Sequence, residues 1–99
     1  AAEVCAPCPA PPGVPLAPSQ AEALARATSR RLSLIQGPPG TGKTHCAAAI
    51  AAAFVARYPH DRVLLCAGSN VATDNLFTKV QELAPGVRAL RMGDGAGEE

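Results

Sequence analysis

The sequence predicts an α/β fold in which helices cover the faces of a parallel sheet. Two observations carry this prediction. Short apolar runs alternate with segments of helical character in the order helix, strand, helix, strand, helix, strand. A glycine-rich loop also connects the first apolar run to the helix that follows it. The chain has 99 residues, enough for one domain or part of one, and because it does not begin with Met we expect a fragment, a processed product or an incomplete gene model.

The amino-terminal segment and the first helix differ in composition. Residues 1–18 contain six prolines, so we expect an extended linker or tail with polyproline II character. Residues 19–99 are expected to form the ordered domain. Its first helix begins with a capping-box pattern, in which Ser19 caps the helix and Glu22 reaches back, and it is predicted to run to about Ser29.

The later elements follow from the hydrophobic pattern. A continuous aliphatic run is typical of a strand buried in a parallel sheet, and an alanine-rich segment with apolar residues every four positions is typical of a helix. Pro59 ends the first of the later helices, and residues 68–70 supply a turn and a cap for the second. The predicted strands are residues 32–36, 63–67 and 87–92, and the later helices are predicted over 43–58 and from 70 to just before Pro85.

The loop between the first strand and its helix matches the phosphate-binding pattern G-x-x-x-x-G-K-[ST] without a mismatch. Glycines allow a tight turn that directs backbone N–H groups inward as a cradle for anionic oxygens. The following helix adds the positive end of its dipole. The strand, loop and helix together supply the context that the pattern requires. The predicted nucleotide-binding residues are Gly37, Pro38, Pro39, Gly40, Thr41, Gly42, Lys43 and Thr44.

Two of these residues also carry the predicted chemistry. The Lys43 ammonium can reach the β- and γ-phosphates of a nucleotide, and the Thr44 hydroxyl can ligate Mg²⁺. Lys43 and Thr44 are therefore the candidate catalytic residues, with Thr44 as the candidate metal ligand. A plain turn between a strand and a helix does not explain why Lys and Thr follow it.

Charge and cysteine content limit the other functions. The net charge is +1, so this segment alone is expected to bind nucleic acid weakly. Cys5 and Cys8 form a C-x-x-C pair, but no second pair or histidine follows at zinc-ligand spacing, so metal binding is disfavoured. The apolar stretch 46–56 is about half the roughly 20 residues that a membrane span needs, and no signal peptide is visible.

Three stretches resemble the first RecA-like domain of superfamily 1 RNA/DNA helicases, in the group typified by the nonsense-mediated-decay helicase, senataxin and the DNA2/NAM7-type enzymes. Residues 16–20 resemble L-N-x-S-Q, the family's Q motif. Residues 33–44 resemble the S-L-I-Q-G-P-P-G-T-G-K-T of motif I. Residues 64–76 resemble the L-V-C-A-P-S-N-x-A-V-D-x-L of motif Ia, with Gly68 in place of the usual Pro. The resemblance implies a P-loop NTPase fold of the RecA-like type, a three-layer parallel sheet with flanking helices that is incomplete here.

The resemblance also implies roles for individual residues. Gln20 would bind the adenine edge, since a planar amide offers a paired donor and acceptor; the alternative is a polar residue in an exposed first turn. Ser69 and Asn70 would contact the backbone of single-stranded nucleic acid, and the alternative is an N-cap pair. Gly68 loosens the turn that presents Ser69 and Asn70.

The implied activity is ATP-dependent helicase or translocase action, with ATP and Mg²⁺ as cofactors. Single-stranded RNA or DNA would be the partner through the complete enzyme, which is expected to be cytoplasmic or nuclear. Phosphoryl transfer also needs a carboxylate that holds Mg²⁺ and usually an arginine. The family's later motifs and its second RecA-like domain are absent, so the 99-residue chain alone is expected to be inactive. In the family, strands from the missing part complete the sheet.

Two other functions fit parts of the sequence. An ATPase of the AAA+ class also favours G-P-P-G-T-G-K-T, but the S-N-x-A-x-D-x-L run is not expected there. A truncated nucleotide binder that does not hydrolyse ATP would use the same loop without turnover. The helicase interpretation is favoured because three motifs support it together.

Overall fold

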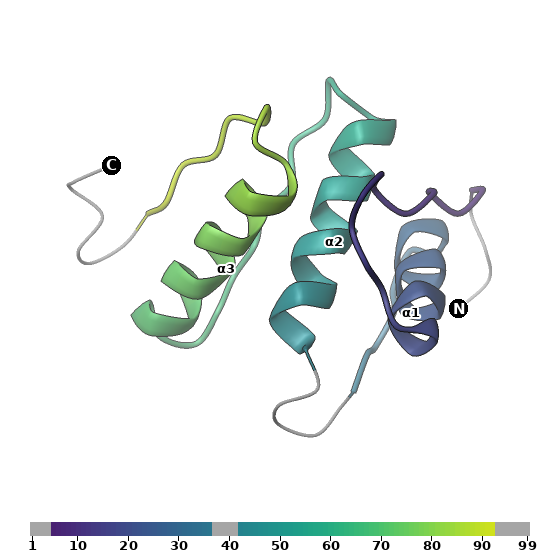
Figure 1. The fold of residues 1–99 in the computed structure, drawn as a ribbon, viewed down its shortest axis with the longest axis horizontal. Helices are drawn as coiled ribbons and strands as arrows, with labels where there is room; N and C mark the ends of the chain where they lie inside the picture. The colour runs from purple at the N-terminus through teal and green to yellow at the C-terminus, as the bar shows by residue number, and fades with distance from the viewer. Residues whose placement is uncertain (1–4, 37–41, 93–99) are drawn as a thin grey trace.

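A computed structural model describes residues 5–36 and 42–92 of the chain, and this part contains three α-helices (Figure 1). They are α1 (Pro18–Ser29), α2 (Lys43–Arg57) and α3 (Asn70–Leu83). α2 lies in the centre and packs against both α1 and α3. All three helices run in the same direction, and the segments between them return in the opposite direction (Figure 1). This is the connectivity expected of an α/β protein.

Helix α1 begins one residue earlier than the capping pattern predicts. Ala17, with an extended backbone, is the N-cap residue, and Pro18 occupies the first helical position, where its fixed φ is already suitable. Ser19 therefore lies inside the first turn and does not cap the helix, so that expectation was wrong. Half of a capping box is still present, because Gln20 Oε1 accepts a hydrogen bond from the Ala17 N–H at 2.9 Å.

Helix α2 begins and ends close to the predicted residues and packs closely on two sides. It starts at Lys43 and stops before Pro59. Its small side chains allow its neighbours to approach, since the distance between helix axes is set by the side chains at the contact. Its buried residues are Cys46, Ala48, Ala49, Ala51, Ala52 and Ala53.

The core forms where α1 meets α2. Leu24 of α1 is only 2% exposed and packs with Ala49, Ala53 and Cys8. The Cys8 backbone N–H also donates to the Thr28 hydroxyl at 2.9 Å. Residues 5–17 therefore lie against the helices. The division of the chain at residue 18 into a linker and a domain stays a prediction.

Helix α3 has the predicted N-cap. Ser69 Oγ accepts a hydrogen bond from the Ala72 N–H at 3.1 Å, which satisfies one of the unpaired donors of the first turn. Among the apolar residues of this helix, Val80 is buried and Leu83 packs at the edge of the core. Val71, in the first turn, is 70% exposed.

The predicted parallel sheet is not formed among the described residues. Segments 32–36, 63–67 and 87–92 contain no strand, and no backbone hydrogen bond between described residues joins them. Leu34 and Leu64 are 93% and 86% exposed. A strand forms only beside a second strand whose N–H and C=O groups can pair with its own. Two parallel strands that are consecutive in the chain need not be neighbours in the sheet, because a further strand can lie between them. The three segments lack such neighbours here.

The core around Leu24 provides a stability prediction. Leu24→Ala is expected to lower the free energy of unfolding by about 2–4 kcal/mol, because it leaves a cavity at the contact between α1 and α2. Val71→Ala, at an exposed position of α3, is the control and should change it by about 0.5 kcal/mol or less. Chemical denaturation followed by circular dichroism measures both. Equal effects of the two substitutions would contradict the packing described for Leu24.

Candidate nucleotide-binding and nucleic-acid-binding sites

The phosphate-binding loop ends at the first turn of α2. The predicted residues Gly37, Pro38, Pro39, Gly40 and Thr41 lie outside the described residues. Gly42 is the N-cap of α2 and has φ +78° and ψ 32°, a left-handed conformation that favours glycine. Its carbonyl accepts the first helical hydrogen bond, from the Cys46 N–H at 2.9 Å.

Lys43 and Thr44 occupy the first turn of α2 and are both exposed. The first N–H groups of a helix have no partner within the helix, and the dipole places about half a positive charge at that end. No acidic side chain lies in this first turn to oppose an anion. The local structure is therefore suited to bind phosphate, with the Lys43 ammonium as an added positive charge.

Gln20 connects the start of α1 with the end of the loop. Its Nε2 group donates to the Gly42 carbonyl at 3.4 Å, while its Oε1 atom accepts from Ala17. A Cβ atom on Gly42 would lie 2.8 Å from this Nε2 atom, so a larger residue there would push the Gln20 amide away from the Gly42 carbonyl. A primary amide has two N–H donors and two acceptor lone pairs, so one of each is left for an adenine ring.

His45 also joins the amino-terminal segment to α2, a contact that the sequence did not predict. Its Nε2 atom lies 2.8 Å from the Pro15 carbonyl oxygen, and because a carbonyl only accepts, this nitrogen must carry the proton. No sequence pattern predicts a contact between His45 and the Pro15 carbonyl, because the two residues are 30 positions apart. The His45 side chain therefore helps to hold the chain around Pro15 beside the first turn of α2.

The candidate nucleic-acid residues lie at the amino terminus of α3. Ser69 and Asn70 are both exposed, although the Ser69 hydroxyl is engaged as the helix cap. Arg91, which follows α3, donates from Nε to Asp74 Oδ1 at 2.7 Å and from Nη2 to the Asn70 carbonyl at 3.5 Å. Sequence reasoning placed Arg91 in the predicted strand 87–92 but gave it no role, because its carboxylate partner lies 17 positions away.

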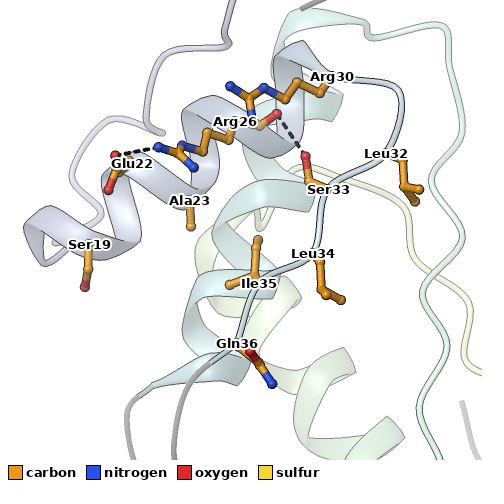
Figure 2. Close-up of a pocket in the computed structure, with 10 residues that line it drawn as sticks. All are labelled: Ser19, Glu22, Ala23, Arg26, Arg30, Leu32, Ser33, Leu34, Ile35 and Gln36. Atoms are coloured by element: carbon orange, nitrogen blue, oxygen red, sulfur yellow. Dashed lines mark hydrogen bonds and ion pairs between the residues drawn. The ribbon is translucent and has the colours of Figure 1, made fainter. Parts of the chain in front are cut away.

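A hollow of about 310 Å³ lies between α1 and residues 32–36 (Figure 2). Glu22, expected to complete a capping box, instead pairs with Arg26 here at 3.1 Å. The Ser33 hydroxyl donates to the Arg26 carbonyl at 3.2 Å and ties the segment to the helix. Leu34 in the wall of the hollow is almost fully exposed. Because neither Gln20 nor Lys43 borders the hollow, we assign it no ligand.

No group of three or more His, Cys, Asp or Glu side chains gathers within residues 5–36 and 42–92. Cys5 instead donates to the Thr28 carbonyl at 3.3 Å, and its hydrogen bond to the Tyr58 phenol is the main cause of a raised pKa of that phenol. All four cysteines are free thiols.

The left-handed Gly42 and the exposed start of α2 have the conformation expected where a P-loop meets its helix. The chain belongs to the AAA domain family, whose sequence model matches residues 15–99. The fold class is therefore confirmed at the level of the P-loop domain. Within the described residues, no helix is both long enough and apolar enough to cross a bilayer.

The most similar curated relatives include several helicases. The chain is 46% identical over 74 residues to the ATP-dependent helicase NAM7 of Saccharomyces cerevisiae, a match covering 75% of this chain and 7% of NAM7. It is 45% identical over 82 residues to the regulator of nonsense transcripts 1 homolog of Arabidopsis thaliana, covering 82% of this chain and 6% of that protein. It is 35% identical over 78 residues to the DNA polymerase alpha-associated DNA helicase A of Saccharomyces cerevisiae, covering 79% and 11%.

These matches confirm the resemblance to superfamily 1 helicases. The chain spans 11% or less of the length of these three relatives. No solved structure matches the chain.

The surroundings of Cys46 provide a second prediction. Burial raises the pKa of the Cys46 thiol, so less of it is present as the reactive thiolate at neutral pH. Cys66 is exposed and is the matched control in the same chain. We expect Cys46 to react with a thiol-specific disulfide reagent about tenfold or more slowly than Cys66, as measured at pH 7.5 in single-cysteine variants. Equal rates would show that the first turn of α2 is more open than described.

Proposed function

We propose that this chain is the ATP-binding segment of an ATP-dependent RNA/DNA helicase or translocase. The observation that carries the proposal is the contact between Gln20 and Gly42, which are 22 positions apart in the sequence. It brings the glutamine of the Q-motif-like stretch to the end of the phosphate-binding loop. An adenine next to Gln20 and phosphates next to α2 would belong to one nucleotide.

The proposed nucleotide is ATP bound with Mg²⁺. Lys43 would neutralise the β- and γ-phosphates, the Thr44 hydroxyl would be a ligand of Mg²⁺, and backbone N–H groups of residues 37–42 would complete the cradle. When bound, Mg²⁺ would supply charge neutralisation at the phosphates. Gln20 would bind the adenine edge with the donor and acceptor that its contacts to Ala17 and Gly42 leave over.

The proposed nucleic-acid contact lies at the start of α3. Ser69 and Asn70 would approach the phosphate backbone of single-stranded RNA or DNA, and the unpaired N–H groups of the first turn would favour the same anion. Movement along the strand would also need the rest of the helicase, including a second RecA-like domain. The complete protein would act in the cytoplasm or the nucleus, where its nucleic-acid partner is found.

The proposed function also accounts for the absence of a sheet among the described residues. Segments 32–36 and 63–67 carry exposed aliphatic side chains, including Leu32, Leu34 and Leu64. Exposed apolar surface of this kind favours burial by a further partner. We infer that these segments become strands of a parallel sheet when further strands of a RecA-like domain lie beside them.

The truncated nucleotide binder remains the second candidate for the 99 residues alone. No acidic side chain lies in the first turn of α2, and no Asp-Glu pair follows the second apolar run. Without a carboxylate that holds Mg²⁺, hydrolysis should be negligible. The helicase relatives favour the first proposal over an AAA+ ATPase.

The role of Lys43 is tested by Lys43→Ala in the full-length protein that carries these residues. ATP hydrolysis should fall by about 100-fold or more, because the charge that neutralises the transferred phosphate is lost. Lys79→Ala removes a lysine whose partner is Glu82 on the surface of α3 and is the control. Steady-state phosphate release measures both. Activity of Lys43→Ala close to that of Lys79→Ala would refute the proposed phosphate site.

The role of Gln20 is tested by Gln20→Glu, which keeps an acceptor for the Ala17 N–H but removes the Nε2 donor. The helix start should be preserved, whereas the affinity for ATP should fall by about tenfold. The informative readout is the ratio of ATP to GTP affinity, since both nucleotides carry the same triphosphate. This ratio should fall in Gln20→Glu and stay constant in the exposed control Gln81→Glu. An unchanged ratio would remove adenine recognition from Gln20.

A further inference from the structure

Arg91 joins the segment after α3 to the first two turns of that helix. Its Nε group donates to Asp74 Oδ1 at 2.7 Å, a short charge-assisted hydrogen bond. Its Nη2 group makes a longer contact of 3.5 Å with the Asn70 carbonyl. Its Nη1 group donates to the Met92 carbonyl at 3.3 Å. One guanidinium therefore contacts the helix start, a carboxylate one turn later and its own segment.

The burial of Arg91 contrasts with that of its neighbours. The Arg91 side chain is 2% exposed, whereas Leu90 and Met92 are 77% and 75% exposed. A guanidinium leaves water at a high free-energy cost unless hydrogen bonds and an opposite charge replace the water. Asp74 and the carbonyl groups supply these partners. The arginine, rather than either apolar neighbour, therefore holds segment 87–92 against α3.

The position of the Arg91 contacts connects them to the proposed nucleic-acid site. Asn70 is the first residue of α3, and its carbonyl belongs to the same turn as the N-cap residue Ser69. Asp74 is 63% exposed and carries a negative charge one turn away, where it would repel a phosphate. Arg91 offsets that charge and holds the Asn70 backbone in one place. The planar, multidentate guanidinium suits both tasks better than an ammonium group would.

We propose that Arg91, paired with Asp74, is a positioning residue for nucleic-acid binding at the amino terminus of α3. It touches no nucleic acid itself and acts through Asn70 and Asp74. The inference rests on the proposed function, because it takes Ser69 and Asn70 as the residues that meet the phosphate backbone. It adds a residue outside motif Ia that determines whether this motif is held in a binding conformation.

The test compares three variants of the full-length protein that carries these residues. Arg91→Ala removes the anchor, and Asp74→Asn removes the ion pair while it raises the net charge by one. Arg88→Ala is the matched control, because it removes the same charge from an exposed position of the same segment. The probes are fluorescein-labelled oligo(U) and oligo(dT) of about 20 nucleotides, longer than common single-stranded site sizes. Fluorescence anisotropy gives their affinity, and a fluorescent ADP analogue gives nucleotide affinity for each variant.

The expected results separate positioning from charge. Arg91→Ala should weaken oligonucleotide binding by about tenfold, and Arg88→Ala by about twofold or less. Asp74→Asn should also weaken binding, although electrostatics alone would make it stronger because a negative charge near the phosphates is lost. Nucleotide affinity should fall much less than oligonucleotide affinity in Arg91→Ala and Asp74→Asn.

Three results would overturn the inference. The first is oligonucleotide binding by Arg91→Ala equal to that of Arg88→Ala. The second is tighter binding by Asp74→Asn. The third is an equal loss of nucleotide and oligonucleotide affinity, which would give Arg91 a role in general folding only. Failure of the unsubstituted protein to bind either oligonucleotide would instead refute the proposed nucleic-acid function, and the inference with it.

Discussion

The close packing of α1 and α3 against the alanine-rich α2 holds both candidate sites in place. Small side chains on α2 let its neighbours approach, and Leu24 of α1 fills the space above Ala49 and Ala53. This packing also fixes the position of α1 along the axis of α2, so that the first turn of α1 lies beside Gly42, at the end of the phosphate-binding loop. The Gln20 contact to Gly42 exists only because this packing brings the two segments together.

Both candidate sites are organised in the same physical way. At α2, the Gln20 amide bonds the carbonyl of the N-cap residue Gly42, and at α3, the Arg91 guanidinium bonds the carbonyl of Asn70. In each case a polar side chain from another segment holds a backbone group at a helix start, where N–H groups are unpaired and attract anions. Neither contact uses a helix-start N–H group, although the Ser69 hydroxyl already engages the N–H of Ala72 at α3.

The absent sheet and the well-packed helices have different physical requirements. A helix satisfies its backbone hydrogen bonds within its own segment, so α1, α2 and α3 form with a few packing contacts. A strand satisfies them only with a neighbour, and the described residues provide none for segments 32–36, 63–67 and 87–92. Their leucines Leu32, Leu34 and Leu64 are therefore left exposed.

The sequence by itself determined the three helices, the helix breaker at Pro59, the Ser69 cap and the phosphate-binding motif that ends at Thr44. These features depend on neighbours within a few positions, where propensity, capping and motif spacing are decisive. Only the tertiary structure decided that Ala17 rather than Ser19 caps α1, that Gln20 reaches the loop, and that Arg91 lies buried against α3. These contacts join residues far apart in the chain, or select among local alternatives by packing. Their free energy depends on burial and on the partners that folding brings together, which no local pattern records.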